Sequence, residues 1–299
     1  MSEFLLGIDW GSTNRRAYLM DHGGRCVRRH ADGVGMLSAR GRFAAALAEL
    51  CEQLAVPAGT PVVMSGMVGS AQGWQEVPYL TADVPLDELP RSLAKVAGGG
   101  RPLFIVPGYC QRGTNVDVMR GEETQLLGAR ALGQGDGWVV LPGTHSKWAQ
   151  LQDGRIARWT TYMTGELFAL LAQGGTLSAL MAEGQEDGDE DRAAFEAGLA
   201  LARERAPLTH TLFSIRARVV TGSLPAEQAR GFVSGLLIGT EFVANAMDAG
   251  GQLAILGSPA LTRRYRDAAS VFGLDVRHID PDEAYCAALA RFFQAKVNP

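Results

Sequence analysis

Apolar and polar positions divide the first 20 residues into two short strands joined by a polar turn. Apolar residues run from Leu5 into Asp9, residues 11–14 are glycine and polar residues, and apolar residues resume over 17–20. Strand, glycine-bearing turn and strand form the pattern of a β-hairpin. We therefore predict a hairpin whose tip is residues 11–14.

Helix-like and strand-like patterns follow along the rest of the chain. Apolar residues at 43, 47, 50 and 54 have the spacing of a helix that buries one face, and similar patterns predict helices over 122–132, 193–205, 261–272 and 280–292. Short apolar runs at 61–64, 103–106 and 253–256 predict buried strands. We expect residues 82–101 to form a surface helix and connection. Residues 226–247, rich in small side chains, should form a long helical region broken near Gly239.

The tip of the first hairpin has the composition of an anion cradle. Glycine lets a ligand approach the backbone, successive N–H groups of a tight turn form a concave nest, and hydroxyls add donors. Asp9 is unsuited to direct contact with phosphate but suits a hydrated Mg²⁺ that bridges to phosphates. An ordinary turn is the alternative. The candidate phosphate-binding residues are Gly11, Ser12, Thr13 and Asn14.

A second stretch repeats this layout. Residues 139–151 again read as strand, turn and strand, with Gly143 standing 132 residues after Gly11 and with Thr144 and Ser146 as hydroxyl donors. A matched strand, turn and strand is much rarer by chance than one turn. The repeat predicts two similar α/β domains facing each other across a cleft, with a triphosphate between the two tips.

Two loops carry further polar candidates. Residues 65–79 follow a predicted strand, where loops of a parallel sheet line the ligand crevice; packing of the loop against its own domain is the alternative. Residues 107–123 hold three carboxylates and two arginines, and the acids could also serve only as N-terminal charges of the next helix. The candidate side chains are Asp117, Glu122, Glu123, Arg112 and Arg120.

Composition narrows the class of protein. The 299 residues, 46% hydrophobic and 20% charged, suffice for two ordinary globular domains. A net charge of −4 without a basic run argues against nucleic acid and membrane surfaces as partners. No secretory signal, no apolar run of ~20 residues and four scattered cysteines indicate a cytoplasmic protein with reduced thiols. A homodimer is left open.

Five sequence blocks carry a resemblance to a known family. The duplicated hairpin resembles the phosphate motifs of the superfamily that joins actin, the heat-shock ATPases and many sugar kinases. The whole chain resembles the 2-dehydro-3-deoxygalactonokinase family through Ile-Asp-Trp-Gly-Ser-Thr-Asn at 8–14, Met-Ser-Gly-Met-Val-Gly-Ser at 64–70, Met-Arg-Gly-Glu-Glu-Thr-Gln at 119–125, Leu-Pro-Gly-Thr-His-Ser-Lys-Trp at 141–148 and Met-Thr-Gly-Glu at 163–166.

The resemblance implies a fold and an activity. It implies two actin-like (ribonuclease H-like) α/β domains related by internal duplication, over residues 1–136 and 137–299, with a nucleotide cleft between them. The expected reaction uses ATP and Mg²⁺ to convert 2-dehydro-3-deoxy-D-galactonate to its 6-phosphate in galactonate catabolism. The alternatives are a kinase for another small sugar acid, or an ATP-binding switch protein without sugar kinase activity.

The resemblance also assigns expected roles to single residues. The base that takes the hydroxyl proton is sought among Glu122, Asp117 and Glu123, with Glu122 favoured, and Lys147 is expected to offset phosphoryl charge. The turn of Gly257 and Ser258 is the candidate adenosine site, and a plain strand-to-helix turn is its alternative. Because a guanidinium binds a carboxylate through two hydrogen bonds, four arginines join the loop residues as substrate candidates: Arg15, Arg16, Arg112, Arg120, Ser65, Gly66, Met67, Trp74, Glu76, Thr164 and Glu166. Thr164 is also expected to cap a helix that starts there.

Overall fold

The computed structural model describes residues 3–97, 100–181, 189–246 and 248–297. By its contacts the chain divides into two compact units. The first unit comprises residues 1–136, 150–159 and 279–299, and the second comprises residues 137–149 and 160–278. The division into domains 1–136 and 137–299 remains a prediction, and the contacts group two later segments with the first unit.

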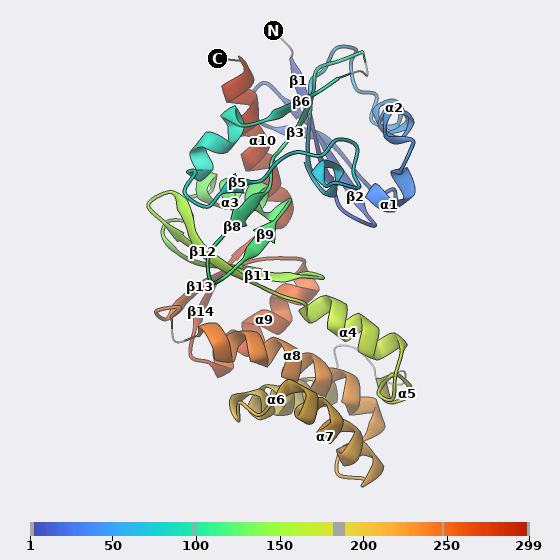
Figure 1. Ribbon diagram of the computed structural model, residues 1–299, viewed down its shortest axis with the longest axis vertical. Coiled ribbons are helices and arrows are strands. Elements are labelled where there is room, and N and C mark those ends of the chain that lie inside the picture. The colour runs from blue at the N-terminus through green and yellow to red at the C-terminus, as the bar shows by residue number, and fades with distance from the viewer. Residues whose placement is uncertain (1–2, 98–99, 182–188, 247, 298–299) are drawn as a thin grey trace. The chain divides into compact units, whose positions relative to one another are not determined.

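The first unit contains a six-stranded sheet with the order β3-β2-β1-β4-β7-β6 (Figure 1). β1 and β2 pair antiparallel, as the predicted hairpin requires, and β1 pairs parallel with β4, which in turn pairs parallel with β7. The strands are β1 (Phe4–Trp10), β2 (Arg15–Asp21), β3 (Cys26–Asp32), β4 (Val62–Gly66), β6 (Ala94–Val96) and β7 (Leu103–Ile105).

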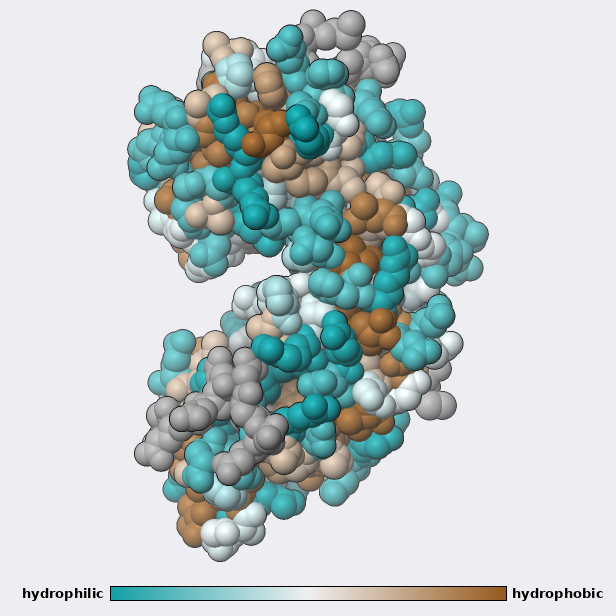
Figure 2. Space-filling model, turned by 180° about the vertical axis from the view of Figure 1, so that it is seen from behind, coloured by the Kyte–Doolittle hydropathy of each residue, from teal (hydrophilic) through white to brown (hydrophobic). Residues whose placement is uncertain are grey.

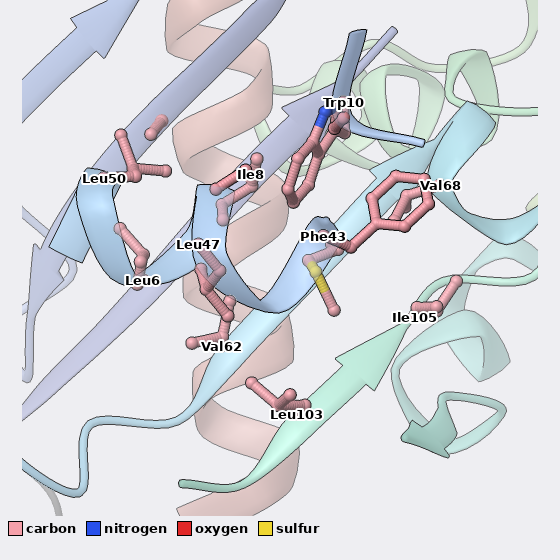
Figure 3. Close-up of a cluster of buried hydrophobic side chains, with 14 of the residues drawn as sticks. Leu6, Ile8, Trp10, Phe43, Leu47, Leu50, Val62, Val68, Leu103 and Ile105 are labelled. Carbon is pink, nitrogen blue, oxygen red and sulfur yellow. The ribbon is translucent and has the colours of Figure 1, made fainter. Parts of the chain in front are cut away.

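Alternate residues of β1 face opposite sides of this sheet. Leu6, Ile8 and Trp10 join the apolar face of α2 (Phe43–Gln53) in a buried cluster, which Figure 3 shows in close-up. Gly7 faces the other side, where a side chain would collide with Leu289 of α10 (Pro281–Val297). The sheet of the first unit is therefore covered by a helix on each face.

The second sheet repeats the first. Its order is β12-β11-β10-β13-β14, which matches β3-β2-β1-β4-β7 position by position, and β10 pairs parallel with β13 as β1 does with β4. This repetition confirms the predicted duplication of an α/β unit. The strands are β10 (Gly137–Leu141), β11 (Ser146–Gln152), β12 (Arg155–Tyr162), β13 (Gln252–Leu256) and β14 (Asp275–Ile279).

Helices make up much of the second unit. In Figure 1, α8 lies beside α6 and α7, and α6 makes the more extensive contact with it. The turn after β13 and the helix that follows it also belong to the second unit. The helices are α4 (Thr164–Gln173), α5 (Ser178–Met181), α6 (Asp189–Arg203), α7 (Leu208–Val220), the 3₁₀ turn η3 (Ala226–Gln228), α8 (Ala229–Asn245) and α9 (Pro259–Val271).

The expected break near Gly239 is wrong, because α8 continues through that residue to Asn245. A Cβ on Gly239 would lie 2.6 Å from the Cβ of Ala202 in α6. The glycine therefore permits close packing of two helices and does not end one of them.

The expected surface helix at 82–101 is only partly correct. Residues 86–91 form the 3₁₀ helix η2 (Leu86–Arg91), but Ala94–Val96 is the edge strand β6, which pairs antiparallel with β7. The dense loop at 107–123 also contains two short strands, β8 (Tyr109–Gln111) and β9 (Asp117–Met119), which join β5 (Leu80–Thr81) in a small sheet. The remaining elements of the first unit are α1 (Met36–Ala39), η1 (Met67–Gly69) and α3 (Glu122–Ala131).

The surface is mixed in character. On the face shown in Figure 2, hydrophilic residues predominate and hydrophobic residues form small separate groups. Within the described ranges, no helix combines the length and the apolar composition needed to cross a membrane. The four cysteines are free thiols.

Candidate active site

Three backbone segments of the first unit meet at the ends of β1 and β4. Asp9 lies opposite Ser65 and Trp10 opposite Gly66 in the parallel pairing. Gly66 has a φ of +89°, and a Cβ there would lie 2.8 Å from the carbonyl oxygen of Trp10. A Cβ on Gly121, just before α3, would lie 3.4 Å from the Cα of Gly66. Glycines thus let the two strand ends and the start of α3 come together.

Asp9 is a perturbed acid at this junction. Its Oδ2 accepts a hydrogen bond from Arg16 Nη2 at 2.8 Å, and its side chain is 19% exposed. Burial raises the pKa of Asp9, the charge of Arg16 lowers it, and the charges of Glu122 and Asp282 raise it further; the net shift is upward. A raised carboxylate pKa means that the surroundings disfavour the anion, so a cation bound beside Asp9 would stabilise its ionised form.

The three candidate bases have different surroundings. Glu123 is fully buried, and both its oxygens accept the Gly121 N–H, at 2.9 and 2.7 Å. Burial raises the pKa of Glu123 to about 8. Glu122 is half-buried and accepts the Arg120 N–H at 3.0 Å, and Asp117 accepts the Val118 N–H at 2.7 Å. Of the three, Glu122 is the one whose charge acts on Asp9.

Two of the four candidate arginines are held by acids. Arg15 is 2% exposed, donates twice to Asp32, at 3.2 and 2.6 Å, and once to the carbonyl of Ala46 at 2.8 Å. It has the surroundings of a structural residue, so its position gives no support to substrate contact. Arg16 is 41% exposed and forms an ion pair with Asp9. Its Nη1 also lies 3.7 Å from Oδ1 of Asp282.

The other two arginines lie on the dense loop. Arg120 stacks over the ring of Tyr79 at 4.2 Å and donates through Nη2 to the carbonyl of Val77 at 2.8 Å. Its Nε and Nη1 are buried and have no hydrogen-bond partner among the described residues. Arg112 is exposed, next to β8. Arg120 therefore joins the loop at 67–79 to the start of α3 and keeps donors unused.

Several candidate substrate residues have structural surroundings. Trp74 stacks on Phe43 with ring centroids 5.9 Å apart, and Met67 packs against the same core cluster. Ser65 is fully buried, with its hydroxyl 2.9 Å from that of Tyr285. Glu76 is exposed. Trp74 and Ser65 therefore pack within their own unit, as the alternative interpretation of this loop expects. The loop as a whole stays a candidate for substrate contact.

The first turn is exposed and closely backed by the chain. Ser12, Thr13 and Asn14 are exposed, and Gly11 donates its N–H to the carbonyl of Asn14 at 3.0 Å. The N–H groups of residues 35–37 donate to the carbonyls of Thr13, Gly11 and Ser12. A Cβ on Gly35 would lie 2.3 Å from the carbonyl carbon of Thr13. The backbone of the turn is thus fixed while its hydroxyls face solvent.

The second turn is backed in a similar way by the start of α4. Glu166 donates its N–H to the carbonyl of Thr144 at 3.0 Å, and its side chain lies 2.6 Å from His145 Nε2. A Cβ on Gly165 would lie 2.4 Å from the carbonyl oxygen of Gly143. The pairing of a turn with a closely packed glycine therefore occurs in both units.

Three expected ligand residues of the second unit bond to protein atoms instead. Lys147 is 4% exposed, and its Nζ donates to Thr161 Oγ1 at 2.9 Å. Ser146 is fully buried and donates to Glu241 at 2.8 Å. Thr164 is the first residue of α4 and makes no cap bond; its hydroxyl also donates to Glu241, so the expected cap is wrong.

Sequence reasoning missed Glu241, the acceptor of these hydroxyls. Its carboxylate is fully buried in α8, and it also accepts from Trp148 Nε1 and the Tyr265 hydroxyl, both at 2.7 Å. Burial raises the pKa of Glu241, and the four hydrogen bonds lower it; the net shift is upward. The available signal was an acid within an otherwise small and apolar stretch, 231–245.

A pocket of about 210 Å³ lies in the second unit beside the second turn. Gly257, expected at the adenosine site, is buried against Pro142 of that turn, and Ser258 is exposed at the start of α9. The next residues of α9 line the pocket. Its walls come from the second turn, α4, α8 and α9: Gly143, Thr164, Gly165, Phe168, Ser234, Leu237, Ile238, Ala260, Leu261, Arg264 and Tyr265.

Comparison with known proteins gives full-length matches. The model of the family described as 2-keto-3-deoxy-galactonokinase matches residues 9–292. A 2-dehydro-3-deoxygalactonokinase of Escherichia coli (strain K12) is 38% identical over 302 residues, which cover 100% of both chains. A crystal structure described as that of a 2-dehydro-3-deoxygalactonokinase protein from Sinorhizobium meliloti is 36% identical, covers 99% of this chain and 97% of its own, and has a TM-score of 0.91.

A more distant structure shares the fold alone. The activator of the 2-hydroxyisocaproyl-CoA dehydratase from Clostridium difficile, solved with bound ADPNP, is 14% identical to this chain. The alignment covers 98% of this chain and 96% of that one, with a TM-score of 0.50.

Proposed function

Because the chain belongs to the 2-keto-3-deoxy-galactonokinase family, we propose that it phosphorylates 2-dehydro-3-deoxy-D-galactonate with ATP in galactonate catabolism. The product is the 6-phosphate. The observation that carries this proposal is the 38% identity to the Escherichia coli kinase over the full length of both chains. The enzyme is then a phosphotransferase with an alcohol group as acceptor.

The reaction needs a base for the sugar hydroxyl, and Glu122 is the best-placed carboxylate. In the transfer, the hydroxyl oxygen forms a bond to the γ-phosphorus of ATP, the bond from that phosphorus to ADP breaks, and the hydroxyl proton passes to Glu122. Half-burial and the position at the start of α3 support this role, because the side chain keeps access to a substrate while the helix holds its backbone in place. Glu123 is fully buried against Gly121, and we assign it to the backbone of the loop.

Asp9 fits the Mg²⁺ that accompanies ATP. It is a hard oxygen donor, and the nearby charges of Glu122 and Asp282 add negative potential that a cation would offset. Mg²⁺ usually takes one or two carboxylates, with waters and phosphate oxygens as the other ligands, and no cluster of three or more acids, histidines or cysteines suited to a metal occurs in the described part of the chain. When bound, the ion supplies charge that offsets the phosphoryl oxygens.

ATP contacts are assigned to the two turns and to the pocket. The exposed residues of the first turn, together with Gly143 and Thr144 of the second, present backbone and hydroxyl groups suited to phosphates. The apolar walls of the 210 Å³ pocket, including Leu237, Ile238 and Leu261, suit the adenosine part. Lys147 and Ser146 are buried, and we assign them to the support of the second turn.

The carboxylate of the sugar acid is assigned to an arginine of the dense loop. Arg15 already has three hydrogen bonds to protein atoms, and Arg16 pairs with Asp9. Within the described ranges, Arg120 has two buried guanidinium nitrogens without hydrogen-bond partners, and it lies beside the loop at 67–79. Arg120 and the exposed Arg112 are therefore the preferred candidates for a bidentate contact.

A coupled assay of ADP release tests the function. The purified chain with Mg-ATP should release ADP only when 2-dehydro-3-deoxy-D-galactonate is added. Aldonic acids and other 2-keto-3-deoxy acids, each at the same concentration, form the comparison panel. A higher kcat/KM for another acid would identify that acid as the substrate. ADP release at the same rate with and without every sugar acid would instead indicate an ATP-hydrolysing switch protein.

A further inference from the structure

The Glu241 carboxylate has a complete set of hydrogen-bond donors. Its Oε2 accepts from Ser146 and Trp148, and its Oε1 accepts from Tyr265 and Thr164. An ionised carboxylate has about four acceptor positions, so these donors use all of them. Every donor is a side chain, and none lies on α8 itself.

These donors come from the elements that surround the pocket. Ser146 starts β11 directly after the second turn, Thr164 starts α4, and Tyr265 lies in α9. Thr164 and Tyr265 also line the pocket. The hydroxyl of Tyr265 lies 3.0 Å from that of Ser146, so the donors contact one another as well. One carboxylate thus joins the turn, two pocket walls and α8.

Burial of a carboxylate costs free energy, because the charge loses its hydration. A charged group without water is tolerated only when hydrogen bonds replace its hydration, and apolar side chains of similar volume pack at least as well. The carboxylate instead restricts its donors, because each hydrogen bond requires the donor side chain to keep one rotamer and one distance. A pocket whose walls are already held in place loses less entropy when a ligand binds.

We propose that Glu241 is the positioning residue that holds the second turn, α4 and α9 in the arrangement that binds ATP. This inference rests on the proposed function, since it assumes that the pocket and the turn bind the nucleotide. Glu241 itself is fully buried and acts through Ser146, Thr164 and Tyr265. The residues assigned to the sugar acid belong to the first unit, so they should not depend on it.

Substitution Glu241→Gln tests the role, because the amide keeps the shape but offers one acceptor atom and turns an NH₂ group toward donors. Isothermal titration calorimetry should show that the Kd for Mg-ATP is about tenfold or more above that of the unaltered chain, as expected for lost hydrogen bonds to a charged group. The KM for the sugar acid, measured at saturating ATP, should stay within about twofold. A role in stability alone would leave the nucleotide Kd unchanged in folded protein.

Two further variants keep the test decisive if Glu241→Gln does not fold. Ser146→Ala removes one donor at a residue with no exposed surface, so an effect on nucleotide affinity must pass through the Glu241 cluster, where its hydroxyl contacts Glu241 and Tyr265. We expect its Kd for Mg-ATP to rise by about threefold. Thr240→Val, at the adjacent position of α8, is the matched control, because among the residues that the structure describes the Thr240 hydroxyl donates to the carbonyl of Leu237 and not to Glu241. It should bind as the unaltered chain does.

The outcomes separate this inference from the proposed function. Folded Glu241→Gln and Ser146→Ala variants that bind Mg-ATP within about twofold of the unaltered chain would overturn the positioning role alone. Failure of the unaltered chain to bind Mg-ATP would overturn the proposed function and the positioning role with it. Equal losses of ATP and sugar-acid affinity would also overturn the inference, since they would indicate general damage.

Discussion

Two neighbouring glutamates at the start of α3 have different surroundings. Glu123 is enclosed and bound to the backbone of Gly121, while Glu122 is half-buried and its charge acts on Asp9. A side chain that takes a proton must reach the substrate, and a fully buried one does not. The choice of Glu122 as base therefore depends on exposure and on its proximity to Asp9.

Glu122→Gln should lower kcat by about 10² to 10⁴ while the KM for ATP changes little. The amide keeps the size of the side chain but cannot accept the hydroxyl proton. Steady-state kinetics of ADP release measures the effect, with Asp117→Asn as the control on the same loop. If Asp117→Asn abolishes turnover and Glu122→Gln does not, the base is Asp117.

Glu123→Gln should reduce the pH dependence of stability. In the folded protein the pKa of Glu123 is about 8, above its ordinary value of 4.5. The unfolded chain therefore binds fewer protons between these values, so stability present below about pH 4.5 is lost as the pH rises through about 8, at up to ~1.4 kcal/mol per unit. Urea unfolding at pH 5 and pH 9 measures this loss.

The variant should lose less free energy of unfolding between pH 5 and pH 9 than the unaltered chain does. Glu76→Gln, at an exposed glutamate, is the control and should keep the full loss. An identical loss in Glu123→Gln and the unaltered chain would mean that Glu123 is already ionised in the folded protein at pH 5.

Single residues were the hardest features to predict from the sequence. Arg15, Trp74 and Ser65 lie in or beside the expected motifs, but they bond or stack with Asp32, Phe43 and Tyr285, which lie 17, 31 and 220 residues away. Local sequence patterns do not predict contacts between residues this far apart in the chain. The same reason hid Glu241, whose four donors lie 24 to 95 residues away.

At the scale of elements, glycines decide which helices can pack closely. A Cβ on Gly128 of α3 would lie 1.7 Å from the carbonyl oxygen of Ala284 in α10. Gly128→Ala should destabilise the protein by about 1–3 kcal/mol through overpacking, despite the higher helix propensity of alanine. Urea unfolding measures this change. Gly135→Ala should be neutral, because a Cβ there would meet no described atom within 4 Å. Equal stability of both variants would contradict the close packing.

The contact between α4 and the second turn predicts an effect on nucleotide binding. A Cβ on Gly165 would lie 2.4 Å from the carbonyl oxygen of Gly143, so Gly165→Ala should displace the turn. We expect the KM for ATP to rise by about tenfold, because small displacements of positioned groups are costly. Gly174→Ala, just after the same helix, meets its nearest atom at 3.7 Å and is the control. Equal KM values for ATP in Gly165→Ala and Gly174→Ala would indicate that the second turn does not contact the nucleotide.

Elements with a strong local pattern were predicted well. The first hairpin, the helix with the stripe of apolar residues at 43, 47 and 50, and the helix expected over 280–292 are confirmed. β6 was missed because it is three residues long and pairs with β7 across a connection. The break at Gly239 was wrong because helix packing overrides the low helix propensity of glycine.

At the scale of the whole molecule, the repeated hairpin was the most informative feature of the sequence. It predicted a duplicated α/β fold, which the matching strand orders confirm, and the motifs predicted a family, which the full-length matches confirm. The roles of single residues remain proposals, because similar folds and motifs fix the surroundings of a site more firmly than the function of each side chain.

On the proposed function, this chain transfers the γ-phosphate of ATP to the primary hydroxyl of a 2-keto-3-deoxy sugar acid. Phosphorus NMR of the products from Mg-ATP and 2-dehydro-3-deoxy-D-galactonate tests it directly. We predict a new phosphate monoester whose signal is split by the methylene protons of C6, and which forms only when both substrates are present. Inorganic phosphate released without the sugar acid, or an ester on a secondary hydroxyl, would contradict the claim.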